Sequence, residues 1–225
     1  MIPAENIQLL AALLTESSLR VSSEAVNTLE EYRRLLLCWN SRMNLISKKD
    51  EARIIRRHFL DSIGLAEVLS FPVGARIMDA GSGPGFPGIP LKIIRPDLDM
   101  TLVDSRKKKT VFLKEAVDKL EIQSCRIINE RVESISQDIE PFDFILSRAV
   151  ADCLTLWMWT ARLLKPVSGR MIVIKGPAAY KEAEALEKSK RVNDLGSVEV
   201  LPYDPFSVSV RDEQSYLVII KKQKR

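Results

Sequence analysis

The stretch Asp79-Ala-Gly81-Ser-Gly83-Pro-Gly85-Phe-Pro-Gly88 decides the fold predicted for this chain. It directly follows a short β-type run over residues 76–79 and opens a helical segment that extends to about residue 94. A strand, a glycine-rich turn and a helix in this order are typical of nucleotide-cofactor sites, because glycines let the backbone approach a ligand closely. The alternative is a glycine- and proline-rich surface turn. The flanking strand and helix favour the cofactor loop.

The glycine spacing fits two classes of cofactor. Gly83-x-Gly85-x-x-Gly88 satisfies the dinucleotide fingerprint, and Asp104 lies near the ~20-residue distance expected of a ribose-binding carboxylate. Asp79, however, precedes Gly81 by two positions and places a carboxylate beside the loop. That anion would repel a pyrophosphate but suits S-adenosylmethionine, which carries an ammonium and a sulfonium and no phosphate. We therefore predict S-adenosylmethionine, held by Asp79 and the loop glycines.

Downstream of the loop, short β-type runs alternate with helical segments. The runs cover residues 100–104, 126–128, 142–146 and 170–174, and a helical window over 107–120 separates the first two. This alternation predicts a parallel sheet with right-handed crossovers. A helix over 180–190 precedes two last runs, 198–201 and 216–220, which only a turn-rich segment separates. Those two runs are expected to pair antiparallel.

The first seventy residues show helical spacing of their apolar side chains. Two such rows are Val26, Leu29, Tyr32, Leu36 and Ile54, Ile55, Phe59, Ile63. The pattern changes near Phe71-Pro72-Val73-Gly74, so we predict an N-terminal helical subdomain over 1–70 and a second domain over 71–225. The fold class predicted is α/β: a Rossmann-like, mostly parallel seven-stranded sheet with an antiparallel last strand, as in class I methyltransferases, under an N-terminal helical cap.

Composition is that of an ordinary globular protein, with 225 residues, 46% apolar and 28% charged, and a net charge of +4. The longest uncharged stretch, over residues 149–161, is broken by Asp152 and too short for a membrane span. Residues 1–14 carry Glu5 and no Lys or Arg, which is not typical of a signal peptide. We expect a cytoplasmic protein that contacts no membrane.

Three cysteines, Cys38, Cys125 and Cys153, are an odd number without a C-x-x-C pair. A disulfide framework and a cysteine-based zinc site are therefore both unfavoured, and no metal is expected. We predict that all three are small buried hydrophobic residues. Trp39, Trp157 and Trp159 lie in apolar helical neighbourhoods, which favours core packing over stacking on RNA bases.

Several motifs together resemble one known family. They are the loop Gly81-Ser-Gly-Pro-Gly-Phe-Pro-Gly-Ile-Pro90, the upstream Trp39-Asn40-x-x-x-Asn44-Leu45 and Arg57-His58-x-x-Asp61-Ser62, and the downstream Ser147-Arg148-Ala149 and Lys175-Gly176. In this order, from about residue 35 to 220, the chain is similar to the glucose-inhibited division protein B family of bacterial 16S ribosomal RNA guanine-N7 methyltransferases. The resemblance implies methyl transfer from S-adenosylmethionine to guanine N7 in a decoding-region hairpin of that RNA.

The resemblance also implies cofactor-binding positions. They fall on Gly81, Phe86, Val132, Glu133 and Arg148. Residue reasoning adds Asp104, which ends the second predicted strand and can accept hydrogen bonds from ribose hydroxyls. Asp104 is equally well placed to cap the helix that begins near Arg106, and Glu133 can equally be solvated, so both alternatives stay open.

Arg148 ends the fourth predicted strand, where ligands bind in open parallel sheets, and it can contact guanine O6 or a phosphate. The alternative is a structural ion pair with Asp61 or Asp79. We assign Arg148 and Lys175 to substrate positioning. Because guanine N7 has an unprotonated lone pair, its methylation requires no general base, and we assign no catalytic role to His58, the only histidine.

Clusters of cations predict an RNA surface. They comprise Lys48, Lys49, Arg53, Arg56 and Arg57, and then Arg106, Lys107 and Lys108. The alternative for each cluster is a solvated face. The expected partner is 16S ribosomal RNA or a small-subunit ribonucleoprotein, bound by a monomer. The rival functions are a methyltransferase for small molecules or proteins, a nicotinamide-dependent oxidoreductase, and a non-catalytic RNA-binding module.

Overall fold

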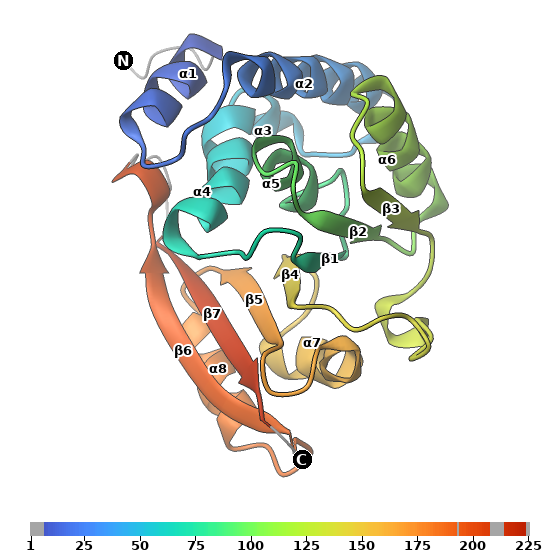
Figure 1. The fold of residues 1–225 in the computed structure, drawn as a ribbon, viewed down its shortest axis with the longest axis vertical. Helices are drawn as coiled ribbons and strands as arrows, with labels where there is room; N and C mark the ends of the chain where they lie inside the picture. The colour runs from blue at the N-terminus through green and yellow to red at the C-terminus, as the bar shows by residue number, and fades with distance from the viewer. Residues whose placement is uncertain (1–6, 193, 208–213, 224–225) are drawn as a thin grey trace.

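The computed structural model describes residues 7–192, 194–207 and 214–223, and within them the chain forms a seven-stranded sheet (Figure 1). Its strands are β1 (Arg76–Ala80), β2 (Asp99–Val103), β3 (Cys125–Ile128), β4 (Phe144–Arg148), β5 (Arg170–Lys175), β6 (Leu195–Tyr203) and β7 (Ser215–Lys222). The strand order is β3-β2-β1-β4-β5-β7-β6. Strands β1 to β5 pair parallel, and β7 pairs antiparallel with both β5 and β6. The predicted sheet is confirmed.

Helices occupy the segments before, between and after the parallel strands. They are α1 (Ile7–Glu16), α2 (Ser23–Met43), α3 (Lys48–Glu51), the π-helix η1 (Ile55–Phe59), α4 (Leu60–Val68), α5 (Gly88–Ile94), α6 (Lys107–Lys119), α7 (Cys153–Thr160) and α8 (Ala179–Glu187). Short 3₁₀ turns are η2 (Val132–Ser134), η3 (Ala161–Leu163) and η4 (Pro205–Ser207). In the described residues, each helix falls short of the length and apolar content that crossing a membrane requires.

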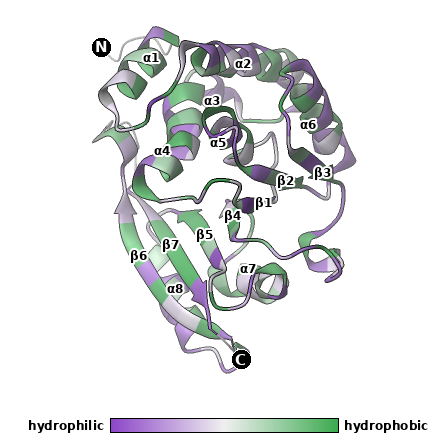
Figure 2. Ribbon diagram, in the orientation of Figure 1, coloured by the Kyte–Doolittle hydropathy of each residue, from purple (hydrophilic) through white to green (hydrophobic). Residues whose placement is uncertain are grey.

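The sheet has one hydrophobic core on each face. Successive residues of a strand point to opposite faces, so Ile77 of β1 enters one core and Met78 the other. The first core also contains buried residues of α1, α2, α4, α5 and α6, and the second contains those of α7, α8 and η2. Figure 1 shows these two groups of helices on opposite sides of the sheet, and Figure 2 shows hydrophobic residues along β5 and β7 between them.

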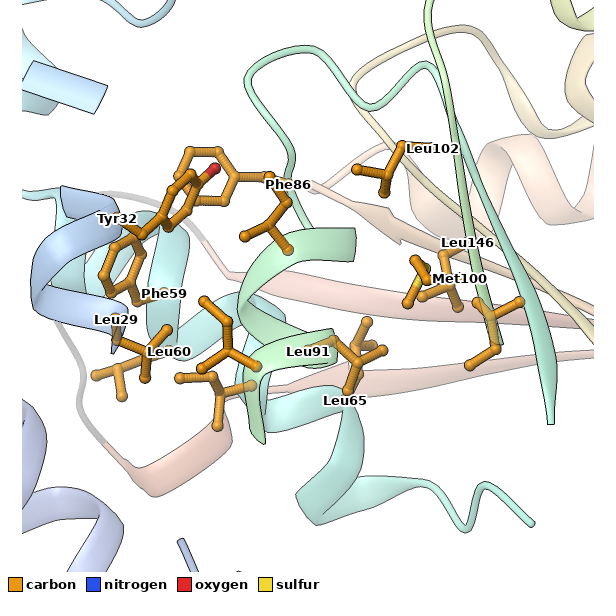
Figure 3. Close-up of a cluster of buried hydrophobic side chains, with 14 of the residues drawn as sticks. Leu29, Tyr32, Phe59, Leu60, Leu65, Phe86, Leu91, Met100, Leu102 and Leu146 are labelled. Carbon is orange, nitrogen blue, oxygen red and sulfur yellow. The ribbon is translucent and has the colours of Figure 1, made fainter. Parts of the chain in front are cut away.

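The N-terminal helices share the first core with the sheet. Figure 3 shows Leu29, Tyr32 and Phe59 packed beside Phe86 of the glycine loop, with Leu91 of α5 leading on to the sheet residues. The helices before residue 71 therefore cover the sheet directly. The division into segments 1–70 and 71–225 stays a prediction.

The prediction that all three cysteines are buried is confirmed only for Cys153. Cys153 is buried and Cys125 half-buried, but Cys38 is exposed. Cys38 lies two residues after Leu36, which faces the core, and two residues turn an α-helix by about 200°. The side chain of Cys38 therefore points to the solvent side of α2. Trp157 is buried as predicted, and Trp39 packs edge-on against Phe112 at 5.7 Å.

Candidate active site

The glycine loop leaves the carboxyl end of β1 and is fixed to the end of β2. The N–H groups of Gly81 and Ser82 both donate to the carbonyl oxygen of Val103, at 2.9 and 2.8 Å. Gly81, Gly83 and Gly85 have φ angles of 76°, 59° and 102°, a region that other residues adopt only at a cost. The loop therefore needs glycine at these positions and presents a backbone surface without Cβ atoms, which is the cradle expected of a cofactor site.

Two carboxyl groups, those of Asp79 and Asp104, accept hydrogen bonds from N–H groups of the loop. Asp79 is fully buried, and its Oδ2 accepts the N–H of Gly88 at 2.9 Å, whereas its Oδ1 accepts no hydrogen bond from the described residues. Burial raises the pKa of Asp79 to about 7. Asp104 directly follows β2 and accepts the N–H groups of Gly83 and Arg106, at 2.9 and 2.8 Å. Asp104 thus ties the loop to the residue that precedes α6.

The N-terminal helices support the loop from the other side. The hydroxyl of Tyr32 in α2 donates to the carbonyl oxygen of Pro84. The ring of Phe86 stacks on the imidazole of His58 at 4.7 Å and meets Tyr32 edge-on at 5.8 Å. Phe86 is 4% exposed, so it acts in this arrangement as the packing link between the loop and the helical cap.

Arg148 stands at the end of β4 within a compact polar cluster. Its guanidinium donates to Nδ1 of His58 and, at 3.0 Å, to the carbonyl oxygen of Arg57, and lies 3.5 Å from Oδ2 of Asp61. It also lies over the ring of Phe86, at 5.6 Å. Arg148 therefore makes the ion pair with Asp61 that the alternative interpretation anticipated. Burial lowers the pKa of Arg148 to about 10, so the guanidinium remains charged at neutral pH.

His58 is held neutral by its surroundings. It lies in η1, a π-helical turn of the kind often found at functional sites. Burial, followed by the charges of Arg148, Arg57 and Arg53, lowers the pKa of His58 well below its ordinary value. Because Nδ1 accepts from Arg148, the proton of the neutral imidazole is on Nε2. The ring serves as an acceptor for Arg148 and as a stacking partner for Phe86.

A pocket of about 710 Å³ opens beside this cluster. Its wall comes from the α3–η1 segment, from the ends of β4 and β5, and from the start of β7; the lining residues are Ser47, Lys49, Asp50, Arg53, Arg57, His58, Asp61, Arg148, Ala149, Ile174, Lys175, Gly176, Gln214 and Ser215. Cations outnumber the two carboxylates of this wall. Arg53 and Arg57 both pair with Asp50, at 3.3 and 3.0 Å, so that carboxylate is already engaged.

The remaining predicted positions lie around the same carboxyl edge of the sheet. Val132 is buried and Glu133 exposed in η2, just after β3, and Glu133 pairs with Arg131 at 3.5 Å. Lys175 lines the pocket, but its amine contacts the carbonyl oxygen of Ala151 at 2.6 Å and Glu182 at 2.8 Å.

The predicted RNA-binding cations fall into two groups. Lys49, Arg53 and Arg57 line the pocket, with Lys48 and Arg56 on the same segment outside its wall, and the second group, Arg106, Lys107 and Lys108, is exposed at the start of α6. Sequence reasoning missed Tyr32, Asp50 and Glu182 as parts of the site. Tyr32 had only the signal of an apolar helical row, and the two carboxylates had none.

The loop and its carboxylates fit S-adenosylmethionine. A Cβ at Gly83 would lie 3.4 Å from the amine of Lys109, and the only neighbour closer than 4 Å besides that amine is a backbone oxygen of Gly81, so the loop surface there is open among the described residues. Asp104 keeps lone pairs for hydroxyl donors, since each carboxylate oxygen can accept two hydrogen bonds. Asp79 supplies a buried carboxyl group beside the loop for a cationic ligand. When bound, the cofactor supplies an electrophilic methyl group.

Fold and site together define a class I, S-adenosylmethionine-dependent methyltransferase. The structure is similar to a SAM-dependent O-methyltransferase from Thermotoga maritima, with a TM-score of 0.57, 18% sequence identity, and coverage of 85% of this chain and 72% of that chain. It is also similar to a TehB-like SAM-dependent methyltransferase from Corynebacterium glutamicum, with a TM-score of 0.57, 17% identity, and coverage of 86% and 99%.

Sequence comparison gives the family. The family model GidB, described as rRNA small subunit methyltransferase G, matches residues 25–203. Ribosomal RNA small subunit methyltransferase G of Thermoanaerobacter pseudethanolicus is 38% identical over 200 residues, which cover 88% of this chain and 82% of the relative. The enzyme of that name from Moorella thermoacetica is 36% identical over 219 residues, covering 96% and 90%. The chain belongs to the GidB family. The predicted family, enzyme class and cofactor are confirmed, and the oxidoreductase alternative is excluded.

Proposed function

We propose that this enzyme transfers the methyl group of S-adenosylmethionine to N7 of a guanine in 16S ribosomal RNA. The observation that carries the proposal is the cationic pocket at the carboxyl edge of the sheet, where Arg148 of its wall ends β4, the neighbour of β1, and Ala149 follows it. A phosphate-bearing substrate suits a wall in which cations exceed carboxylates. The family membership points to the same substrate.

The chemistry asks little of the protein beyond placement. Guanine N7 exposes a lone pair on the base edge, so no proton needs to be removed before it attacks the methyl group. The Nδ1 lone pair of His58 is engaged by Arg148 and the pKa of its imidazole is lowered, which agrees with a reaction that needs no general base. Arg148 positions the base and its neighbouring groups, whereas Lys175, bound to the Ala151 carbonyl oxygen and to Glu182, acts on the same site indirectly. Proximity and orientation supply up to ~7–11 kcal/mol of the barrier reduction in favourable cases.

The proposed cofactor contacts follow the loop and the ends of β2, β3 and β4. They are Asp79, Gly81, Gly83, Gly85, Phe86, Asp104, Val132, Glu133 and Arg148. Asp104 stands where ribose hydroxyls bind in such folds, and the η2 turn stands at the end of the next strand, on the adenine side. Phe86 and Asp79 are enclosed, so both act by supporting the loop rather than through open contact surface.

The start of α6 supports an RNA-binding surface. Its first turn begins with Lys107, Lys108 and Lys109 and holds no carboxylate in the described structure. Cations at a helix N-terminus oppose the macrodipole, at about 0.3–1 kcal/mol each. Asp104, whose Oδ2 lies 3.9 Å from the amine of Lys109, offsets part of that cost, and an anion bound by the exposed Lys107 and Lys108 would offset more. The second cationic group of the surface is Lys48, Lys49, Arg53, Arg56 and Arg57, around the pocket.

The enzyme is further proposed to act in the cytoplasm as a monomer, on 16S ribosomal RNA alone or within a small-subunit ribonucleoprotein, without a metal ion. Each of these points extends the proposal beyond the enzyme class. The expectation rests on the family's substrate and on a reaction that uses a lone pair and a sulfonium only.

Labelled methyl transfer tests the proposed substrate. The enzyme is incubated with methyl-labelled S-adenosylmethionine and unmethylated 16S ribosomal RNA, and the label is mapped by nuclease digestion and mass spectrometry. The proposal predicts one labelled 7-methylguanosine. Label on protein or on a small molecule, with none on the RNA, would place the activity with another substrate class. Binding of the RNA without any transfer would favour the non-catalytic RNA-binding module.

A further inference from the structure

Lys175 is not a freely projecting cation. It ends β5 on the face of the sheet that carries α8, and its side chain is 12% exposed. Its amine donates to the carbonyl oxygen of Ala151 at 2.6 Å and pairs with Glu182 at 2.8 Å. A lysine bound in this way holds the backbone at Ala151 in place, and its amine is not available to a ligand.

Glu182 holds the other end of the same loop. It lies in α8, and the Oε2 atom that pairs with Lys175 also accepts the backbone N–H of Cys153 at 2.9 Å. Cys153 is the first residue of α7 and follows Asp152, whose side chain caps that helix. One carboxylate oxygen therefore joins the end of β5 to the start of α7. Between Arg148 and Cys153 runs the loop of residues 149–152, here called the β4–α7 loop.

The β4–α7 loop lies between the two ligand sites. On one side, Val150 packs against the glycine loop, because a Cβ built at Gly81 would lie 2.4 Å from Cγ2 of Val150. On the other side, Ala149 lines the pocket beside Arg148. Ala149 also has a φ angle of 55°, a left-handed conformation that costs a non-glycine residue energy. Such a conformation persists only where surrounding contacts impose it.

We propose that Glu182, acting through Lys175 and the Cys153 N–H, is a positioning residue for methyl transfer. The pair clamps the β4–α7 loop so that Val150 supports the cofactor loop while Ala149 and Arg148 face the substrate. Glu182 contacts neither ligand site itself. The role in transfer rests on the proposed function, whereas the clamp is a property of the fold alone.

Two variants test the clamp, with a matched control on the same helix. Glu182→Ala removes both contacts of the carboxylate, and Lys175→Met removes the pair from the other side. The control is Glu184→Ala, which breaks an exposed ion pair with Lys188 and lies two residues after Glu182 in α8. Hydrogen exchange of the ligand-free proteins should show faster exchange over residues 149–155 in both variants and no change in the control. Calorimetry should show that Kd for S-adenosylmethionine rises about 3- to 10-fold.

Steady-state kinetics separates positioning from general destabilisation. For Glu182→Ala at saturating S-adenosylmethionine, kcat per cofactor-binding site should fall roughly 10- to 100-fold, while KM for RNA stays within about twofold. The Lys175→Met/Glu182→Ala double variant should lose less rate than the product of the two single losses, because the two residues share one ion pair.

Unchanged exchange over 149–155 in Glu182→Ala would overturn the clamp. Faster exchange with unchanged Kd and kcat, or rate losses that multiply in the double variant, would overturn the positioning role. If the wild type methylated no ribosomal RNA, the proposed substrate would be wrong. Hydrogen exchange over residues 149–155 and the Kd for S-adenosylmethionine would still test the clamp.

Discussion

Asp79 is fully buried, its carboxyl group accepts the N–H of Gly88, and burial raises its pKa to about 7. A carboxyl group in this position keeps its proton when the unfolded chain, with an ordinary value of 3.8, has already released it. The folded state therefore binds more protons between these two pH values. By linkage, the free energy of unfolding falls as the pH rises through this range.

Asp79→Asn should remove that pH dependence. Relative to the wild type, the variant should gain stability progressively from pH 4 to pH 7, up to a limit on the order of 4 kcal/mol, because about three pKa units correspond to that energy. Urea denaturation of both proteins without cofactor, at each pH unit from 4 to 8, measures the difference. Two stability curves that run parallel across this range would contradict the assignment.

Arg148 and His58 form a pair with unequal roles. Arg148→Ala should raise the activation free energy of methyl transfer by about 2–4 kcal/mol, and so lower kcat, because it removes the cation at the end of β4. His58→Ala should lose less, since the imidazole only orients Arg148 and packs on Phe86. Methyl-transfer rates of the two variants and the wild type, at saturating cofactor and RNA, measure the two losses. Equal inactivation of both variants would reveal a direct role for His58.

At the scale of elements, α2 and η1 hold the glycine loop in its conformation. Tyr32 of α2 reaches the loop carbonyl of Pro84, and its ring stacks on Phe59 of η1 at 5.6 Å. Phe59 and His58 in turn pack against Phe86. The cofactor loop is therefore shaped by side chains from a segment that precedes it by about thirty to fifty residues.

Tyr32→Phe isolates this support, and Tyr203→Phe is its matched control. Both variants lose a buried hydroxyl that donates to a backbone carbonyl, from Tyr32 to Pro84 and from Tyr203 to Asp61. Both should lose about 1 kcal/mol of stability, the usual net value of one hydrogen bond. Only Tyr32→Phe should weaken S-adenosylmethionine binding in calorimetry. A cofactor affinity lowered equally in Tyr203→Phe would show that general loosening, not loop support, is responsible.

The elements themselves were predictable because their signals are local. The seven strands of the described sheet lie where alternating or continuous apolar runs occur, but β6 extends beyond its predicted run, to 195–203 instead of 198–201, and β4 is displaced, to 144–148 instead of 142–146. Phe142 instead bridges to Leu164, and Ser147 and Arg148 extend the strand beside Val173 and Ile174 of β5. That extension depends on the neighbouring strand, which a pattern within residues 142–146 does not contain.

The site was predictable only in part for the same reason. Gly81 and Asp104 can be predicted from their spacing within one short, local motif of strand, turn and helix. Arg148 and His58, by contrast, are separated by 90 positions and meet only because η1 packs across the end of β4. The engagement of Lys175 by Glu182 likewise needs the packing of α8 on β5. Side-chain partners across such distances follow from tertiary structure.

At the scale of the whole molecule, cations gather at the carboxyl edge of the sheet. Replacing Lys48, Lys49, Arg53 and Arg56 by Gln should weaken RNA binding and flatten its salt dependence by ~0.7 log units of slope per lost phosphate contact. The control replaces four exposed cations near the opposite edge, namely Arg170, Lys188, Lys190 and Arg191. Filter binding from low to high salt measures both slopes. Equal slopes in both variants would contradict a local RNA surface.

The central claim is that guanine N7 attacks the methyl group, with the protein supplying placement alone. The direct measurement replaces the mapped guanosine of the RNA by 7-deazaguanosine, which removes only the attacking atom. RNA binding should remain nearly unchanged, and methyl transfer from labelled S-adenosylmethionine should cease at that nucleotide. Continued methylation of the 7-deaza nucleotide would contradict the assignment of N7.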